Sequence, residues 1–168
     1  ERLIMRKLTV GNMKKIPTYA EYAAENKGKT NNVDKSYVQK IQGEKSDRRS
    51  SPSLYATYDR TSGDTEYEDE KGNVTKHNTD KQVLNVIGGT QWKVAGDWLE
   101  WTTKVEKEGD YVIGIKGRQG YNRGYIANRS LYIDGEVPFK EVAGLQFTYS
   151  NVWEMLCLQN DKGEAYKF

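Results

Sequence analysis

Residues 97–105, DWLEWTTKV, indicate the fold class more clearly than any other stretch of the chain. In an extended backbone, one face of this stretch carries Leu99, Trp101, Thr103 and Val105, and the other carries Trp98, Glu100, Thr102 and Lys104. Apolar and polar side chains that alternate with a period of two are typical of a half-buried β-strand. We therefore expect a strand here, with Trp101 in the core and Trp98 either exposed or covered by another element.

Similar short segments lie on both sides of this stretch, each bounded by turn residues. We expect further strands over residues 37–44, 53–59, 82–87, 111–116, 129–134 and 152–158. The pair Asp134-Gly135 predicts a tight turn. The charged residues 64–81 favour an exposed hairpin turning at Lys71-Gly72-Asn73, with a loop as the alternative. Regular short strands with turn signals predict an all-β fold, an antiparallel jelly-roll β-sandwich.

The N-terminal part of the chain has a different pattern. Residues 2–10 predict an extended segment, and Thr18 and Glu21 have the spacing of a helix-capping box. A short helix to about Asn26 would end at Gly28, and the polar residues 28–36 are typical of a linker. We expect a strand–helix appendage and linker over residues 1–36 and a sandwich over residues 37–168. The first residue is not Met and residues 164–168 resemble the start of a strand, so we expect a fragment truncated at its C-terminal end.

Composition narrows the classes of function. The 26 Lys and Arg residues nearly balance the 24 Asp and Glu residues, giving a net charge of +2 without a clustered basic face, which does not favour nucleic acid. The sequence has no run of about 20 apolar residues that would insert into a membrane. Twelve Tyr and four Trp suit surfaces that contact sugars or proteins. The single cysteine, Cys157, lies in a predicted strand, so we expect a buried thiol.

Two groups of motifs resemble known families. Residues 88–92 (GGTQW), 95–101 (AGDWLEW), 108–111 (EGDY) and 130–135 (SLYIDG) resemble carbohydrate-binding modules of families six and thirty-five, which are β-jelly rolls. Residues 46–54 and 129–139 resemble a module within exported solute-binding proteins of bacterial sugar-importing transporters. The resemblance implies carbohydrate as ligand, an extracellular or cell-surface bacterial location, and a structural calcium near the first strand. Only Glu44 matches the acidic pair that would hold this ion.

Catalytic motifs are weak. The lone histidine, His77, lies in the charged segment with no nucleophile pattern beside it, so we expect a solvated loop residue. Glycoside hydrolysis needs two carboxylates about 5–10 Å apart, and the sequence singles out no such pair. No phosphate-binding glycine loop is present. We therefore expect no enzyme.

Sugar binding needs flat aromatic faces and a few fixed polar groups. Residues 118–129, between two predicted strands, offer both, although the two tyrosines could equally pack on the base of a solvated loop. The candidate ligand-binding residues are Arg118, Tyr121, Asn122, Arg123, Tyr125, Asn128 and, from another loop, Trp153. Core packing is the alternative for Trp153, and we expect Trp92 to fill the core after the Gly88-Gly89 turn.

The predicted function is that of a non-catalytic carbohydrate-binding accessory domain. It would belong to an exported bacterial protein that captures glycans or sugars, either a solute-binding lipoprotein or a glycan-degrading enzyme, and would contact the rest of that polypeptide. The alternative is a structural or protein-interaction β-sandwich without a free sugar site.

Overall fold

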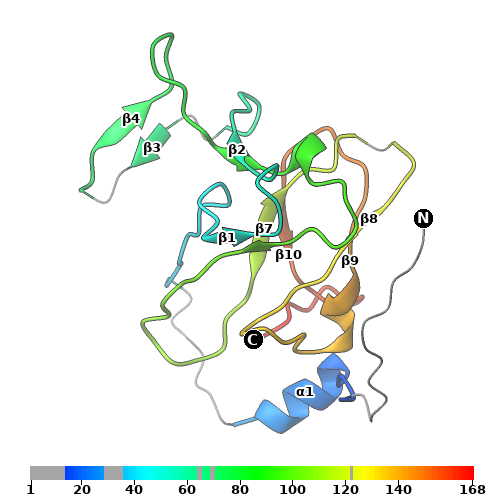
Figure 1. The fold of residues 1–168 in the computed structure, drawn as a ribbon. Coiled ribbons are helices and arrows are strands. Elements are labelled where there is room, and N and C mark those ends of the chain that lie inside the picture. The colour runs from blue at the N-terminus through cyan, green and yellow to red at the C-terminus, as the bar shows by residue number, and fades with distance from the viewer. Residues whose placement is uncertain (1–13, 29–35, 64–65, 69–70, 122) are drawn as a thin grey trace, which may run out of the picture.

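The computed structural model describes residues 14–28, 36–63, 66–68, 71–121 and 123–168, and its regular elements are mostly short strands (Figure 1). The helical elements are α1 (Tyr19–Asn26) and the 3-10 turns η1 (Gly89–Gln91) and η2 (Lys140–Gly144). The strands are β1 (Arg48–Arg49), β2 (Ala56–Thr57), β3 (Glu66–Glu68), β4 (Val74–Lys76), β5 (Val86–Ile87), β6 (Leu99–Glu100), β7 (Gly114–Gly117), β8 (Ala127–Arg129), β9 (Leu145–Phe147) and β10 (Glu154–Cys157). The prediction of a β-rich chain with a minor helical part is confirmed.

The described strands pair antiparallel in two-stranded ladders: β1 with β6, β2 with β5, β3 with β4, β7 with β10, and β8 with β9. In the β7–β10 ladder, Glu154 lies opposite Gly117 and Cys157 opposite Gly114. Backbone hydrogen bonds extend this pairing, since Leu158 N donates to Ile113 O (3.0 Å) and Phe168 exchanges two bonds with Tyr111. The last residues of the chain are therefore joined to the approach to β7.

Two stretches that carry the family resemblance lie side by side. β1 pairs with β6, and Ser50 N donates to Trp98 O (3.0 Å) while Asp47 N donates to Glu100 O (2.9 Å). The Ser50 hydroxyl also donates to Asp97 Oδ1 (2.8 Å). Residues 47–50 and 97–100 thus form one local unit, fixed by backbone and side-chain bonds together.

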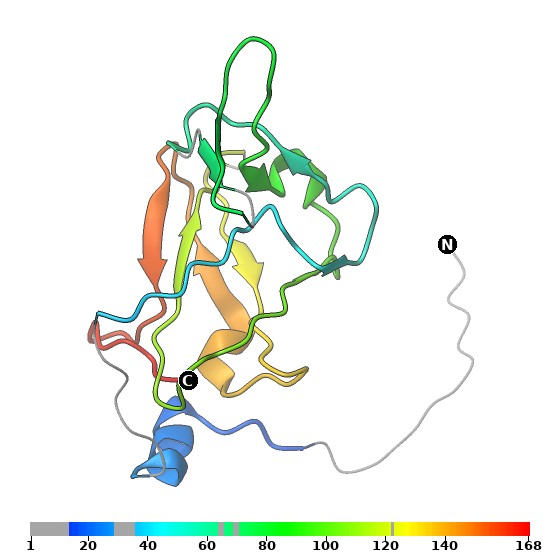
Figure 2. The same ribbon diagram turned by 90° about the vertical axis from the view of Figure 1, so that its left-hand side faces the viewer.

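The hydrophobic core is centred on Phe139. Its side chain is fully buried, together with Val142, and Leu158 and Tyr166 complete the buried cluster. Four rings surround it, with centroids 4.9 Å (Tyr19), 5.2 Å (Tyr22), 5.0 Å (Tyr166) and 5.4 Å (Phe168) away. Aromatic pairs at such distances contribute about 0.5–1.5 kcal/mol each beyond the burial of their area. Figures 1 and 2 show α1 (blue) against this end of the molecule, close to the C-terminus.

Helix α1 begins as the sequence predicts. The Thr18 hydroxyl accepts from Glu21 N, and the Glu21 carboxylate accepts from Thr18 N (2.8 Å), which completes the capping box. Gly28 follows the helix with φ at +79°, the left-handed conformation that favours glycine after a C-terminus. Tyr19 and Tyr22, three residues apart, lie on the face that packs against Phe139. The predicted extended segment 2–10 lies outside the described residues.

Both predicted hairpin turns are present. Asp134 and Gly135 have φ values of 52° and 81°, the left-handed pair that a tight type I′ turn requires, and Ile133 bridges to Glu136 across them. β3 and β4 pair as the hairpin expected within residues 64–81, and Gly72 has φ at +81°. Asp and Gly tolerate a backbone with positive φ, which explains why both turns could be predicted from the sequence.

One predicted strand does not form, and one predicted burial is wrong. No strand forms over residues 37–44, where Val38 and Ile41 are exposed and no facing layer covers them. Cys157 is exposed rather than buried, because Leu156 and Leu158 face inward and the alternation of a strand turns the residue between them outward.

Three ring side chains also differ from expectation. Trp101 and Trp92 are only half-buried, because their indole N–H groups donate to Gly43 O and Asp97 O near the surface. His77 is not simply solvated: it stacks on Tyr58 with centroids 3.9 Å apart, and its Nδ1 accepts from Val83 N (3.4 Å).

The helix cap gives the fold an acid-sensitive contact. The bond from Thr18 N, followed by Lys15 and the Thr18 hydroxyl, lowers the pKa of Glu21 from 4.5 to about 2. A carboxyl whose pKa is lower in the folded state stabilises the fold above its unfolded value, and that contribution is lost as the pH falls. Melting curves should therefore show a shallower loss of stability between pH 4.5 and 2 for Glu21→Gln than for the parent chain. Parallel curves would show that the cap does not couple to folding.

Candidate ligand-binding surface

Arg118, at the end of β7, joins three distant segments of the chain. Its Nη2 pairs with Asp59 Oδ2 at 2.6 Å, and its Nη1 donates to Thr61 Oγ1 (3.0 Å). Its guanidinium carbon lies 5.1 Å from the centre of the Trp153 ring, a cation–π distance. The Arg118 and Asp59 side chains are 23% and 19% exposed, so solvent screens this pair only in part.

Thr61 is the hub of this Arg118 network, which comprises Asp59, Thr61, Arg118 and Trp153. Its hydroxyl accepts from Arg118 and from Trp153 Nε1 (3.3 Å) and donates to Asp59 Oδ1 (2.6 Å). Thr61 N also donates to Asp59 Oδ1 (2.7 Å). These bonds from Thr61, and then the charge of Arg118, hold the pKa of Asp59 below its ordinary value. The carboxylate therefore stays ionised and holds the guanidinium in one place.

Further hydrogen bonds connect the Arg118 network to Asn85, Ser62 and Lys116. Asp59 N donates to Asn85 Oδ1 (2.8 Å), and Asn85 Nδ2 donates to the hydroxyl of buried Ser62 (2.7 Å). Lys116 Nζ, on β7, donates to Ser62 O (2.7 Å). Among the described residues, no buried side-chain nitrogen or oxygen lacks a hydrogen-bond partner. These bonds join the segment after β2 to β7, so they help to position Arg118, from which the loop starts.

The loop after Arg118 is clipped by one amide. Gln119 Oε1 accepts from Tyr121 N (3.2 Å), and its Nε2 donates to Tyr125 O (3.1 Å). Gln119 O also accepts from Ser150 N (2.9 Å), which ties the loop to the segment before β10. The Tyr121 and Tyr125 side chains remain 67% and 73% exposed. Gln119 therefore holds the backbone N–H of Tyr121 and the backbone carbonyl of Tyr125, while both rings are exposed to water.

At the other end of the loop, Arg129 of β8 packs on the ring of Trp92. The Arg129 guanidinium lies 4.6 Å from the Trp92 ring centre and donates to Trp92 O (3.2 Å). Burial lowers the pKa of Arg129, although a guanidinium remains a cation. The Tyr121 ring lies about 3.7 Å from the point where a Cβ on Gly89 would sit, which places Tyr121 beside the Gly88-Gly89 turn.

Two further polar candidates face solvent. Arg123 is exposed, with its guanidinium 5.8 Å from the Tyr149 ring centre. No carboxylate pairs with Arg123 among the described residues. Asn128 lies exposed on β8, opposite Gln146 of β9. Asn122 lies outside the described residues.

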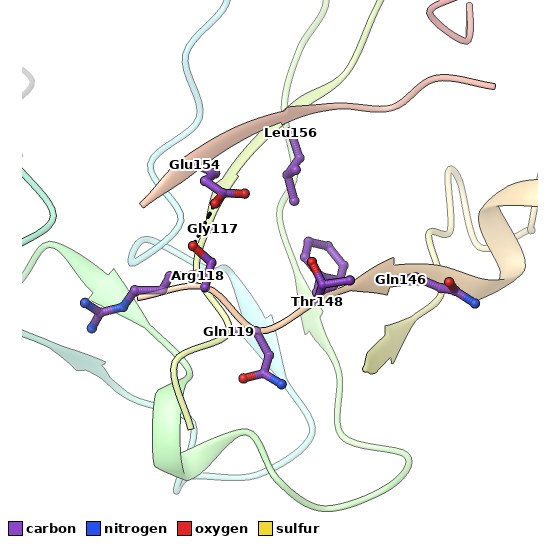
Figure 3. Close-up of a pocket in the computed structure, with 9 residues that line it drawn as sticks. Gly117, Arg118, Gln119, Gln146, Thr148, Glu154 and Leu156 are labelled. Carbon is purple, nitrogen blue, oxygen red and sulfur yellow. Dashed lines mark hydrogen bonds between the residues drawn. The ribbon is translucent and has the colours of Figure 1, made fainter. Parts of the chain in front are cut away.

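A small cavity lies beside the loop, between β7, β9 and β10 (Figure 3). Its volume is about 40 Å³, enough for a few water molecules and far below the roughly 300 Å³ at which ligand pockets begin. The Arg118 side chain points away from Thr148 and Leu156 (Figure 3), and Ser150 Oγ bonds to Glu154 Oε1 (2.7 Å). A ligand of this region would therefore lie on the open surface.

The structure separates the sequence candidates into two groups. Arg118 and Trp153 come together inside the Arg118 network, where Asp59 and Thr61 occupy the guanidinium. Four further candidates are each exposed: Tyr121, Arg123, Tyr125 and Asn128. Sequence reasoning missed Asp59, Thr61, Gln119 and Tyr149. The Asp59 and Thr61 spacing is a local turn signal that could have been found, whereas the partners of Gln119 and Tyr149 depend on tertiary contacts.

The expected calcium ligand Glu44 stays a prediction. Calcium takes six to eight oxygen ligands. Within the described part of the chain, no three or more His, Cys, Asp or Glu side chains come together, so Glu44 is in no such group. In those same residues, no helix has the length and apolar character needed to span a bilayer.

The network makes a stability prediction at Thr61. Thr61→Val keeps the shape of the side chain but removes the hydroxyl that serves Arg118, Trp153 and Asp59. Because Thr61 is exposed, water replaces part of what the variant loses, and the expected cost is that of a typical net hydrogen bond, about 0.5–1.5 kcal/mol. Urea denaturation should show a loss of this size for Thr61→Val and almost none for Thr90→Val, an exposed control in η1. Equal midpoints for the two variants would mean that the network contributes no stability.

Comparisons with known proteins give no relatives for this surface. No protein-family model matches the chain, and no curated protein or solved structure matches it significantly.

Proposed function

We propose that this chain is a non-catalytic carbohydrate-binding domain that holds its ligand on the surface formed by Tyr121, Arg123, Tyr125 and Asn128. The scaffold of the proposal is a jelly-roll sandwich in an exported bacterial protein that captures glycans or sugars. The observation that carries it is the pair of exposed tyrosine rings whose backbone groups, Tyr121 N and Tyr125 O, are both hydrogen-bonded to the Gln119 amide.

Exposed rings on a fixed loop suit sugar binding for a physical reason. A pyranose presents an apolar C–H face that packs on an aromatic ring, and its hydroxyls exchange water bonds for protein bonds with little net gain. Binding energy then comes largely from the two rings, and ordering them costs less where their backbone groups are already bonded. The Arg118 network and the Gln119 clip supply this preorganisation. Affinity should be modest, since an open surface buries little of the ligand.

The free charge of Arg123 favours an acidic sugar. Arg118 is paired with Asp59, and Arg129 is held on Trp92, so neither offers an open fork to a ligand. Arg123 has no acidic partner among the described residues and lies over Tyr149. A guanidinium binds a carboxylate through two parallel hydrogen bonds. We therefore expect a preference for glycans that contain uronic acids over neutral glycans.

A protein-interaction domain is the second candidate. Exposed apolar side chains also lie elsewhere, including Met155, Val152 and Val112 near the β7–β10 ladder. Met155 and Cys157 face outward together there, which suits contact with another protein surface as well as it suits water. Loss of sugar binding with retained partner binding would favour this candidate.

Isothermal titration with oligogalacturonides and with neutral xylo-oligosaccharides tests the proposal. Tyr121→Ala and Tyr125→Ala should each weaken binding about tenfold, because stacking of one ring is worth about 1–1.5 kcal/mol. Both variants should keep the parent melting temperature, since exposed loop positions change stability by under about 0.5 kcal/mol. Arg123→Gln should remove the preference for the acidic oligosaccharide and leave neutral binding unchanged.

Tyr132→Ala is the matched control, because Tyr132 is 62% exposed but lies outside the loop. It should bind like the parent chain. Equal weakening by all three tyrosine variants would contradict the assigned surface, and no binding by the parent chain to either oligosaccharide would favour the protein-interaction domain.

A further inference from the structure

A groove lies at the other end of the molecule from the Arg118 loop, where α1 meets the C-terminal turn. It has a volume of about 230 Å³ and is lined by Tyr19, Ala20, Glu141, Asn160, Asp161 and Tyr166. Tyr19 and Ala20 come from the first turn of α1, Glu141 from η2, and the remaining three from the segment after β10. The groove is therefore built from three separate parts of the chain that the Phe139 core holds together.

The lining is acidic and contains no basic side chain. Among the residues that the structure describes, the Glu141 carboxylate accepts from Tyr19 N (2.9 Å) but forms no ion pair. Asp161 forms neither a hydrogen bond nor an ion pair with any of them. A third carboxylate, Glu164, is close by, since its Oε2 accepts from Asn160 Nδ2 (2.7 Å). The partial positive charge at the N-terminus of α1 is already balanced by two carboxylates, because Glu141 accepts from Tyr19 N and Glu21 accepts from Thr18 N.

Tyr166 adds an observation that is independent of charge. The residue is 6% exposed, and its ring packs between Phe139 (5.0 Å) and Tyr19 (4.6 Å). Its hydroxyl has no hydrogen-bond partner among the described residues. Burial, and then the charges of Glu141 and Asp161, raise the pKa of the phenol, so its oxygen lies within the field of both carboxylates. Because no buried side-chain oxygen of the described residues lacks a partner, this oxygen reaches the surface while the ring below it is buried, and Tyr166 lines the groove.

We propose that this groove binds a primary alkylammonium group, carried by a free amine or by a lysine side chain. The ammonium would donate to Asp161, Glu141 and the Tyr166 hydroxyl, which accepts without a proton change. The methylenes would pack against Tyr19 and Ala20. An ammonium has three donors and no acceptor, which matches a lining that offers carboxylate and hydroxyl oxygens. The site is separate from the proposed sugar surface and does not depend on it.

Two-dimensional NMR of the full chain at low ionic strength tests the site. The probes are 1,5-diaminopentane, Nα-acetyl-lysine N-methylamide and, as an uncharged match, 1,5-pentanediol. Both amines should give saturable shifts at the amides of Ala20 and Asp161, and the diol should give none. Tighter binding of the lysine derivative would assign the group to a peptide, and tighter binding of the diamine would assign it to a free amine. Equal shifts with the diol, or none with either amine, would overturn the proposal.

Two variants connect the shifts to the named oxygens. Asp161→Asn removes one charge from an exposed position, and Tyr166→Phe removes only the hydroxyl. Each should weaken amine binding about fivefold or more, because each deletes a charge-assisted hydrogen bond. Asp134→Asn, at an exposed turn, is the control and should bind like the parent. Should Tyr166→Phe disturb the core, Asp161→Asn still decides, and parent-like binding by that variant would overturn the proposal.

Discussion

The buried ring of Phe139 is the contact on which the rest of this end of the molecule depends. Tyr19 and Tyr22 of α1, together with Tyr166 and Phe168 of the C-terminal segment, all place their rings within 5.4 Å of its centroid. The four residues come from opposite ends of the chain. Backbone bonds then continue outward from this point, from Lys140 N to Pro17 O (2.8 Å) and from Tyr166 N to Leu158 O (2.8 Å). Helix α1 thus packs against the core through its partly buried tyrosines, beside the ladder of β7 and β10.

The opposite end of β7 is held by polar contacts instead. Arg118 follows the strand directly, and its bonds to Asp59 and Thr61 tie β7 to the segment after β2, while Trp153 stacks from the approach to β10. These bonds place Arg118, from which the loop starts, without a large apolar core. The Gln119 amide then holds the backbone of Tyr121 and of Tyr125, whose side chains are exposed. The two ends of the molecule therefore combine an aromatic core with a rigid polar support for the candidate surface.

Local signals in the sequence predicted the features that depend on few residues. The capping box at Thr18 and Glu21, the glycine stop at Gly28 and the left-handed turn at Asp134-Gly135 all depend on neighbours along the chain, and all three are present. Burial was harder to predict because it depends on what lies across from a strand. Val38 and Ile41 have no facing layer, and the position of Cys157 followed from which neighbour faces inward, so both were predicted incorrectly. The role of Gln119 depended on a loop conformation that spacing does not reveal, whereas the exposed Tyr121 and Tyr125 could be proposed from loop composition.

The central claim is that the loop after Arg118 presents Tyr121 and Tyr125 to solvent while Tyr166 is held in the Phe139 core. NMR of ring-labelled tyrosines with a soluble paramagnetic probe measures this directly, because relaxation of each ring increases with its access to solvent. The account predicts strong relaxation enhancement at the Tyr121 and Tyr125 rings and little at the Tyr166 ring. Protection of Tyr121 and Tyr125 equal to that of Tyr166 would contradict it, because the two loop tyrosines would then be core residues.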